Sequence, residues 1–257
     1  MQNSKGTVAL ISVLCLGLAA MVGLNLYQMQ KPEEDTKDIF GAQVRAYLLE
    51  NPAVIREAIQ VLSATEAAEA RQKAKEQLAS RLNELENDGY SFVAGNPDGD
   101  ITIVEFFDYQ CGYCKRSYPD LMKTVEEDGN IRLVMKEFPI LGDESVLAAR
   151  AVMAAEKQGK YNEFHKVLME SRGGLSLDKI MSYAQGLGLN VQQLAKDMGS
   201  DTISKSLSQT YELAQALNIT GTPAFVIGGQ LAPGAIPADT MKRLVAEARS
   251  KKSSATN

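Results

Sequence analysis

The stretch Ile101-Thr-Ile-Val-Glu-Phe-Phe-Asp-Tyr-Gln-Cys-Gly-Tyr-Cys114 decides the fold of this chain. Its first seven residues form a short apolar run rich in β-branched side chains, which is typical of a buried strand. Cys111 follows four residues after the run, and a helical pattern extends from Cys111 to about Val125. A second apolar run, Ile131 to Phe138, predicts a second strand. Together they predict a strand–helix–strand unit with a right-handed crossover.

The C-terminal half predicts an α/β domain with a helical insertion. From Glu144 to Leu217 the pattern is helical and is interrupted by glycines. Ala224 to Ile227 then predicts another strand, and a last helix is expected from Pro237 to Ala248. Because the strand-forming parts flank roughly 75 helical residues, we expect those residues to form an inserted helical lobe.

A long helical segment precedes this domain. Asn51-Pro52 is a favourable helix start, with Asn51 as N-cap and Pro52 at the first helical position, and helical character continues to about Leu85. A helix with one apolar stripe is not stable alone in water. It must pack on its own domain or on another copy of the chain. The spacing leaves both arrangements open, because the heptad pattern is not strict.

The N-terminus predicts export. No charged residue lies between Thr7 and Leu24, and the run, which includes Cys15, is strongly apolar. Lys5 precedes the run and acidic residues at 33–35 follow it, so the rest of the chain is expected outside the cytoplasm. The length lies between that of a cleaved signal and that of a spanning helix, and an A-x-A cleavage motif is missing. An uncleaved anchor is slightly favoured, and the compartment is expected to be oxidising.

Composition excludes two classes of function. The 257 residues contain 27 Lys and Arg against 32 Asp and Glu, a net charge of −5, which argues against nucleic-acid binding. Only three cysteines and one histidine are present, so a four-ligand zinc site is close to excluded. We expect neither a metal nor a cofactor. The single histidine, His165, is interpreted as a packing or surface residue.

Cys111-Gly112-Tyr113-Cys114 predicts a redox site. Cys111 lies at a helix N-terminus, where unpaired N–H groups and the helix dipole stabilise a thiolate. Cys114 lies one turn later, close enough to form a disulfide with it. A purely structural disulfide is the alternative, but so short a loop constrains the unfolded chain little. A CxxC pair behind a strand–helix junction favours redox chemistry.

These residues carry a family resemblance. Val104 to Cys114, followed far downstream by Gly221-Thr-Pro-Ala-Phe225, resembles the DsbA-type thiol:disulfide oxidoreductases of bacterial periplasms. The resemblance covers about residues 90–248. It implies an α/β, thioredoxin-like fold with an inserted helical domain. It also implies that Pro223 follows a cis bond and faces the cysteine pair, and that Thr222 and Pro223 hold a substrate strand, with Gly112 and Tyr113 beside it.

The resemblance also implies roles for the site residues. Cys111 is expected to be the nucleophile and Cys114 the resolving cysteine. Glu105 matches a buried acid beneath the disulfide that relays a proton, and Lys136 matches a lysine near that acid. An ordinary ion pair within the sheet is the alternative for both residues.

The dipeptide between the cysteines departs from the strongly oxidising DsbA proteins. Gly112-Tyr113 lacks their histidine, so a weaker oxidant is expected. Cys-Gly-Tyr-Cys and Thr222 before Pro223 are instead similar to the dimeric isomerases of the DsbC type. Those proteins also carry an N-terminal dimerisation segment.

The predicted organisation follows from these elements. We expect a signal or anchor at 1–27, a helical oligomerisation segment at 28–88, a thioredoxin fold at 89–138 and 219–250 around a helical insertion at 139–218, and a disordered tail at 251–257. The predicted function is a periplasmic oxidase or isomerase of disulfides in exported proteins. A membrane redox partner of the DsbB or DsbD type and a homodimer, or a trimer, are expected. The alternatives are a dedicated reductase for cytochrome or metal-stress targets and a membrane-tethered chaperone or scaffold.

Overall fold

The computed structural model describes residues 18–27 and 34–256. The chain divides into two units, one ending at Ala68 and one beginning at Glu69, which is earlier than the predicted boundary after residue 88. The first unit contains a helical stretch at 18–27, helix α2 (Glu34–Glu50) and the first part of helix α3 (Pro52–Ser80). The predicted helix start at Pro52 is confirmed.

The described part of the chain contains no helix that is both long and apolar enough to cross a membrane. Most of the apolar run that predicts a signal or anchor, including Cys15, lies outside the described residues.

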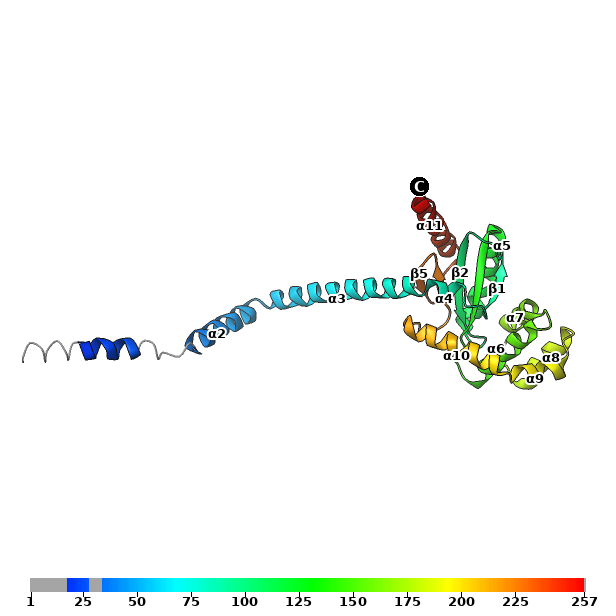
Figure 1. The fold of residues 1–257 in the computed structure, drawn as a ribbon, viewed down its shortest axis with the longest axis horizontal. Helices are drawn as coiled ribbons and strands as arrows, with labels where there is room; N and C mark the ends of the chain where they lie inside the picture. The colour runs from blue at the N-terminus through cyan, green and yellow to red at the C-terminus, as the bar shows by residue number, and fades with distance from the viewer. Residues whose placement is uncertain (1–17, 28–33, 257) are drawn as a thin grey trace, which may run out of the picture. The chain divides into compact units, whose positions relative to one another are not determined.

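The second unit is built around a five-stranded sheet (Figure 1). Its elements after α3 are α4 (Leu82–Glu86), β1 (Phe92–Gly95), β2 (Ile101–Phe107), α5 (Gly112–Asp128), β3 (Ile131–Glu137), α6 (Asp143–Glu156), α7 (Tyr161–Glu170), α8 (Leu177–Gly186), α9 (Val191–Met198), α10 (Asp201–Ala216), β4 (Ala224–Ile227), β5 (Gln230–Pro233) and α11 (Ala238–Thr256).

The strands lie in the order β1-β3-β2-β4-β5. Strands β2 and β3 are parallel and are joined through α5, and the other three neighbouring pairs are antiparallel. The three strands expected from the sequence are confirmed. The edge strands β1 and β5 were not expected, because each has only four residues and is largely half-exposed, so neither gives a clear apolar run.

The central strands are covered on both faces, as alternation along a strand requires. Ile103 and Phe107 of β2 pack in the larger core with the cysteines, α5, α6 and α7. Val104 and Phe106 point to the other face, where they pack with Leu85 of α4 and with residues from α10. Glu105 therefore lies on the face that carries the cysteines.

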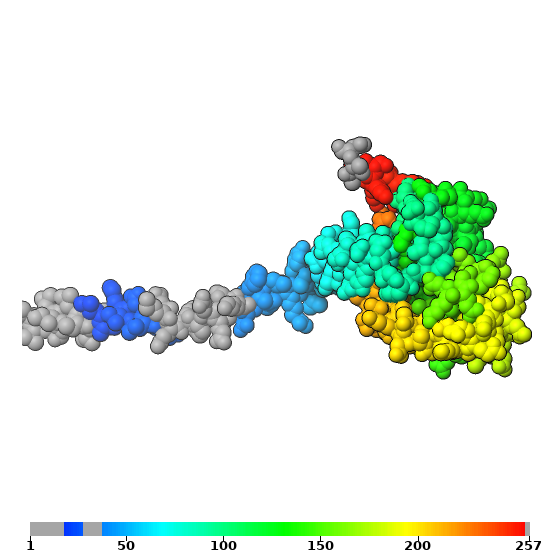
Figure 2. All heavy atoms as spheres, turned by 45° about the vertical axis from the view of Figure 1, so that its right-hand side comes forward, coloured from blue at the N-terminus to red at the C-terminus, as the bar shows by residue number. Residues whose placement is uncertain are grey.

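The helices α6 to α10 between β3 and β4 form the predicted insertion. Helices α7 to α9 form a lobe coloured yellow-green to yellow, and α10, coloured golden, extends from it (Figure 1 and Figure 2). The last helix is longer than expected. Because α11 continues to Thr256, the prediction of a disordered tail is wrong for residues 251–256.

Candidate active site

Cys111 is the N-cap of helix α5, directly after the loop that leaves β2. Its sulfur accepts a hydrogen bond from the backbone N–H of Cys114 at 3.4 Å. The same sulfur lies 3.2 Å from the carbonyl oxygen of Thr222, to which the thiol form donates. The strand-to-helix junction thus places the sulfur at the unpaired donors of the helix N-terminus. Cys111 is buried except for 5% of its surface.

The two cysteines have opposite acidities. Hydrogen bonds from the Cys114 thiol, from the Thr222 side chain and from backbone N–H groups of the first helical turn lower the pKa of Cys111 to about 5, although burial opposes this. Donating to Cys111 raises the pKa of Cys114, and burial and the charge of Glu105 raise it further. Both cysteines are free thiols here. At neutral pH the pair therefore offers one thiolate and one buried thiol.

The loop before β4 brings Thr222 and Pro223 to the cysteines. The bond between them is cis, as the resemblance implies. A groove of about 220 Å³ runs beside this bond, lined by residues 218–224 and by Leu231, Pro233 and Gly234. Tyr113 is 61% exposed next to the cysteines, and the guanidinium of Arg116 lies 4.2 Å from the centre of its ring. The nucleophile thus lies beside an open backbone segment and an exposed aromatic ring.

Glu105 lies beneath the cysteine pair and is fully buried. Neither of its carboxyl oxygens has a hydrogen-bond partner within the described part of the chain. Burial, together with the charge on Cys111, raises the pKa of Glu105 to about 8. A carboxyl with a pKa near 8 can either hold or accept a proton near neutral pH, which is the property required of a general acid or base.

Lys136 does not lie near Glu105, so its predicted role at the cysteines is wrong. Lys136 is paired with Phe106 in the register of β2 and β3, and its side chain points to the face of the sheet opposite Glu105. There it forms a buried ion pair with Asp88 and donates to the carbonyl of Glu84 at 3.3 Å. The sheet ion pair, the alternative for this residue, describes Lys136 correctly.

A second carboxyl, Glu137, lies on the cysteine face, and the sequence interpretation missed it. It accepts hydrogen bonds from Tyr109 and Tyr161. His165 is a buried packing residue whose Nδ1 lies 2.9 Å from the Tyr109 oxygen. The sequence shows Glu137 as an acidic residue within the second apolar run, and the register of β2 and β3 places it two residues beyond Met135, the partner of Glu105.

Asp108 was also missed, although it fixes the loop before the nucleophile. Its buried carboxylate accepts hydrogen bonds from the N–H groups of Gln110, Ile140 and Leu141 and from the Ser145 hydroxyl. Its own carbonyl accepts from the N–H of Cys111 at 3.1 Å. Within residues 18–27 and 34–256, no three His, Cys, Asp or Glu side chains are grouped as a metal site would need.

The fold and this site define the class of thioredoxin-fold proteins with a CxxC redox centre. The model of the DSBA-like thioredoxin domain matches residues 102–246, and that of the N-terminal domain of the copper resistance protein ScsC matches residues 37–69. The chain belongs to the DsbA-like thioredoxin-domain family, whose members are thiol–disulfide oxidoreductases.

Solved structures agree with this assignment. A thioredoxin-like oxidoreductase from Silicibacter pomeroyi is 42% identical, with a TM-score of 0.64, over 65% of this chain and 97% of that chain. Proteus mirabilis ScsC in a transitional conformation is 32% identical, with a TM-score of 0.63, over 86% of this chain and 100% of that chain.

Curated relatives are more distant. A probable disulfide bond formation protein D from Bacillus cereus is 27% identical over 164 residues, which are 59% of this chain and 75% of the relative. A Na⁺/H⁺ antiporter, NhaA 1, from Salinispora arenicola is 25% identical over 158 residues. The chain spans 24% of that antiporter's length, so the similarity concerns one part of it.

Proposed function

We propose that this protein catalyses thiol–disulfide exchange in exported proteins, with Cys111 as the nucleophile. The observation that carries the proposal is the position of the Cys111 sulfur at the start of α5, where it accepts from the backbone N–H of Cys114 beside the open groove along Pro223. A low thiol pKa and access to a substrate backbone are the two properties that exchange requires.

The geometry supports the following sequence of steps. The Cys111 thiolate attacks a substrate disulfide, forms a mixed disulfide and releases one substrate thiolate. Either the released thiolate attacks another substrate disulfide and the thiolate liberated there attacks the mixed disulfide, which isomerises the disulfides and frees Cys111, or Cys114 resolves the mixed disulfide. For resolution, Glu105 takes the Cys114 proton, and the new Cys114 thiolate bonds to Cys111 and displaces the second substrate thiolate. Oxidation of a substrate is the reverse sequence, starting from the Cys111–Cys114 disulfide.

A refolding assay on a substrate with scrambled disulfides tests the nucleophile. Cys111→Ala should abolish the activity, whereas Cys114→Ala should retain the attack and accumulate a mixed disulfide that is visible by non-reducing electrophoresis. Activity retained in Cys111→Ala would refute the assignment. A chaperone or scaffold would suppress aggregation equally with and without Cys111.

The first unit supports oligomerisation. Apolar side chains of α2 and α3 are exposed at regular intervals, namely Ile39, Phe40, Val44, Tyr47, Ile55, Ile59 and Leu62. An apolar helix face of this kind is stable in water when another surface covers it. The occupant that we propose is the same segment of further copies, as a dimer or trimer that sets several active sites around one substrate.

Deletion of residues 34–68 tests this role. The deletion stops before Leu78 and Leu85, which are buried in the core of the second unit, so the catalytic unit should remain folded. We expect a monomer in sedimentation analysis, with the reactivity of Cys111 unchanged and a lower rate of isomerisation. An unchanged sedimentation profile would contradict the role in oligomerisation.

We further propose a periplasmic location, with a membrane redox partner of the DsbB or DsbD type that restores the cysteine pair. The uncharged run from Thr7 to Leu24 and the reactive dithiol both favour an oxidising compartment. Fractionation of cells that express the full chain, followed by trapping of the pair's redox state in cells lacking either partner, tests both statements.

A further inference from the structure

Two buried carboxyls lie side by side on the cysteine face of the sheet. Glu105 on β2 is in register with Met135 of β3, and Glu137 lies two residues further along β3. Residues two apart on a strand point to the same face, so both carboxyls point toward the core that contains the cysteines. The strand spacing places their Cα atoms roughly 8 Å apart.

Two tyrosine hydroxyls donate to the carboxyl of Glu137. One of its oxygens accepts from the hydroxyls of Tyr109 and Tyr161, at 2.9 and 2.8 Å. Burial raises the pKa of both tyrosines well above the ordinary value, so each hydroxyl keeps its proton. Since Tyr109 donates its proton to Glu137, its oxygen accepts from the Nδ1–H of His165. Burial lowers the pKa of His165 to about 3, so its ring is neutral.

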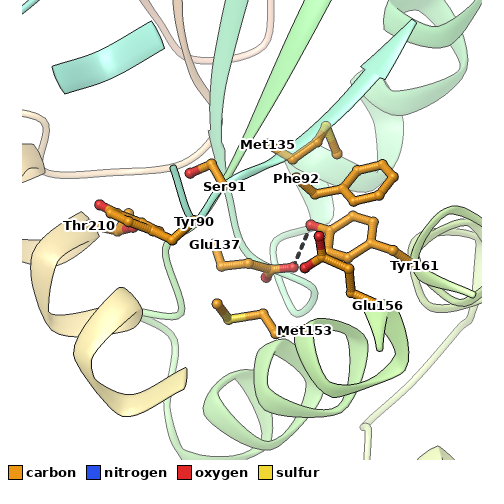
Figure 3. A pocket seen from close by; sticks show the side chains of 9 residues that line it. All are labelled: Tyr90, Ser91, Phe92, Met135, Glu137, Met153, Glu156, Tyr161 and Thr210. Carbon is orange, nitrogen blue, oxygen red and sulfur yellow. Dashed lines mark hydrogen bonds between the residues drawn. The ribbon is translucent and has the colours of Figure 1, made fainter. Parts of the chain in front are cut away.

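The second oxygen of Glu137 gives the carboxyl a connection to water. This oxygen is buried and has no hydrogen-bond partner among the residues that the structure describes. The carboxyl lines a cavity together with Ser91, Tyr161 and the exposed Glu156 (Figure 3). The volume of about 10 Å³ admits one water molecule. Glu137 can therefore exchange a proton with the surface, whereas Glu105 is enclosed beneath the cysteines.

The charged and titratable groups that face Glu137 come from each element packed against it. Glu105, Asp108 and Tyr109 lie on β2 and the loop after it, and Glu156, Tyr161 and His165 lie on or next to α6 and α7, with Tyr90 across the cavity. None of them is a cation at neutral pH. Burial raises the pKa of Glu137 to about 8, and the charges of Asp108 and Glu105 add to the rise.

We propose that Glu137 is a positioning residue of the redox site, whose charge controls the protonation of Glu105 and thereby the reactivity of Cys114. This inference rests on the proposed function. When Glu137 is ionised, Glu105 holds its proton and cannot take the proton of Cys114. When Glu137 is protonated through the cavity, Glu105 ionises more readily, accepts the Cys114 proton, and frees the sulfur to attack the mixed disulfide. Glu105 and Glu137 thus titrate as a coupled pair that exchanges protons with solvent through the cavity beside Glu137.

The step balances without another reactant. The proton moves from the Cys114 sulfur to the Glu105 carboxylate, a bond forms between the sulfurs of Cys114 and Cys111, and the bond from Cys111 to the substrate sulfur breaks. The two cysteines are oxidised to a disulfide and the substrate sulfur leaves as a thiolate, which water protonates.

The reaction of the reduced full chain with a chromogenic aromatic disulfide separates the two cysteines. Attack by Cys111 releases a first aromatic thiol, and resolution by Cys114 releases a second. In Glu137→Gln, whose amide oxygen still accepts from both tyrosines, we expect the midpoint of the second phase to fall by at most about 1.5 pH units, the size expected for charges roughly 8 Å apart at an effective dielectric constant of about 20. The acceleration should appear above pH 8, where Glu137 is ionised, and should be small at pH 7, where burial keeps Glu137 protonated. The first phase should not change.

Matched variants identify the cause. Glu163→Gln removes an exposed carboxylate of α7 that pairs with Lys160, and should leave both midpoints unchanged. Tyr161→Phe removes one donor to Glu137, keeps Glu137 protonated to higher pH, and should shift the second midpoint in the same direction by a smaller amount. If Glu137→Gln fails to fold, the midpoint of the second phase in Tyr161→Phe tests the role of Glu137 instead.

The two proposals fail separately. The role of Glu137 alone would be overturned if folded Glu137→Gln keeps the pH midpoint of the second phase while Glu105→Gln loses the pH dependence of that phase. A structural role would change the unfolding temperature and leave the midpoint in place, which also overturns it. Failure of the unsubstituted protein to release either aromatic thiol would instead refute the proposed function.

Discussion

The acidity of Cys111 depends on a neighbour that can be removed without disturbing the backbone. The largest cause of its low pKa is the hydrogen bond from the Cys114 thiol, ahead of the contribution from Thr222 and from the N–H groups of the first helical turn. Cys114→Ala removes that donor and keeps the N–H that bonds to the Cys111 sulfur at 3.4 Å. Cys114→Ser retains a hydroxyl donor of similar size.

The expected effect of Cys114→Ala on the pKa of Cys111 follows from how far that pKa is lowered. The pKa of Cys111 falls from the usual 9 to about 5. At pH 7 the sulfur is then about 99% thiolate, against about 1% for an ordinary thiol. If the Cys114 donor supplies the largest share, Cys114→Ala should raise the midpoint by more than about one pH unit, whereas Cys114→Ser should remain near the midpoint of the unsubstituted protein.

Alkylation of Cys111 by iodoacetamide between pH 3 and 9 measures the midpoint directly. In both variants Cys111 and Cys15 are the remaining cysteines, so modification of the peptide that contains Cys111 is followed by mass spectrometry. A Cys114→Ala midpoint equal to that of Cys114→Ser would show that the helix N-terminus and Thr222 suffice and that the donor is unimportant. A midpoint near 9 in the unsubstituted protein would refute the whole account of the nucleophile.

Three further predictions concern stability, measured by urea unfolding of the reduced protein. Asp88→Asn should lower the free energy of unfolding by about 3 kcal/mol, because it leaves the fully buried Lys136 without its carboxylate partner. Lys136→Met should lower it less, since Met suits the apolar cluster on that face of the sheet. Equal losses in the two variants would contradict a buried ion pair. In the folded protein Glu105 has a pKa of about 8, whereas in the unfolded chain the carboxyl has a pKa near 4.5, so its contribution to stability declines as the pH rises between these values. Glu105→Gln should therefore gain stability relative to the unsubstituted protein as the pH is raised from 5 to 9. Parallel curves of unfolding free energy against pH for the two proteins would exclude the raised pKa. Gly95→Ala should lower the free energy of unfolding by about 3 kcal/mol, because Gly95 has a φ of +70° and an added Cβ would lie 2.5 Å from the Ile131 carbonyl oxygen. Gly89→Ala should lower it by about 1 kcal/mol, because Gly89 has a similar φ of +77° but open space around an added Cβ. Similar losses in the two variants would show that the close contact at Gly95 relaxes freely.

The elements that sequence analysis predicted well are those with a local signature. Strand β2 is a continuous apolar run, helix α3 begins at Asn51-Pro52, and Cys111 caps α5 four residues after β2 ends. Each depends on residues adjacent along the chain, so the backbone preference is visible in the sequence. The cysteine spacing and the Thr222-Pro223 motif likewise belong to short segments, and they indicated the redox chemistry and the fold.

What the sequence alone determined is therefore the order of the three buried apolar strands and of the helices between them, with the cysteine pair at the start of α5. The tertiary structure decided which side chains share a face. Lys136 and Glu137 are adjacent in the chain, yet the first lies with Asp88 on one face and the second with Tyr109 and Tyr161 on the other. Successive side chains of β3 point to opposite faces of the sheet, and the register of β3 with β2 is set by long-range pairing. A shift of one residue along β3 therefore decides whether a charged side chain points to the face that carries the cysteines.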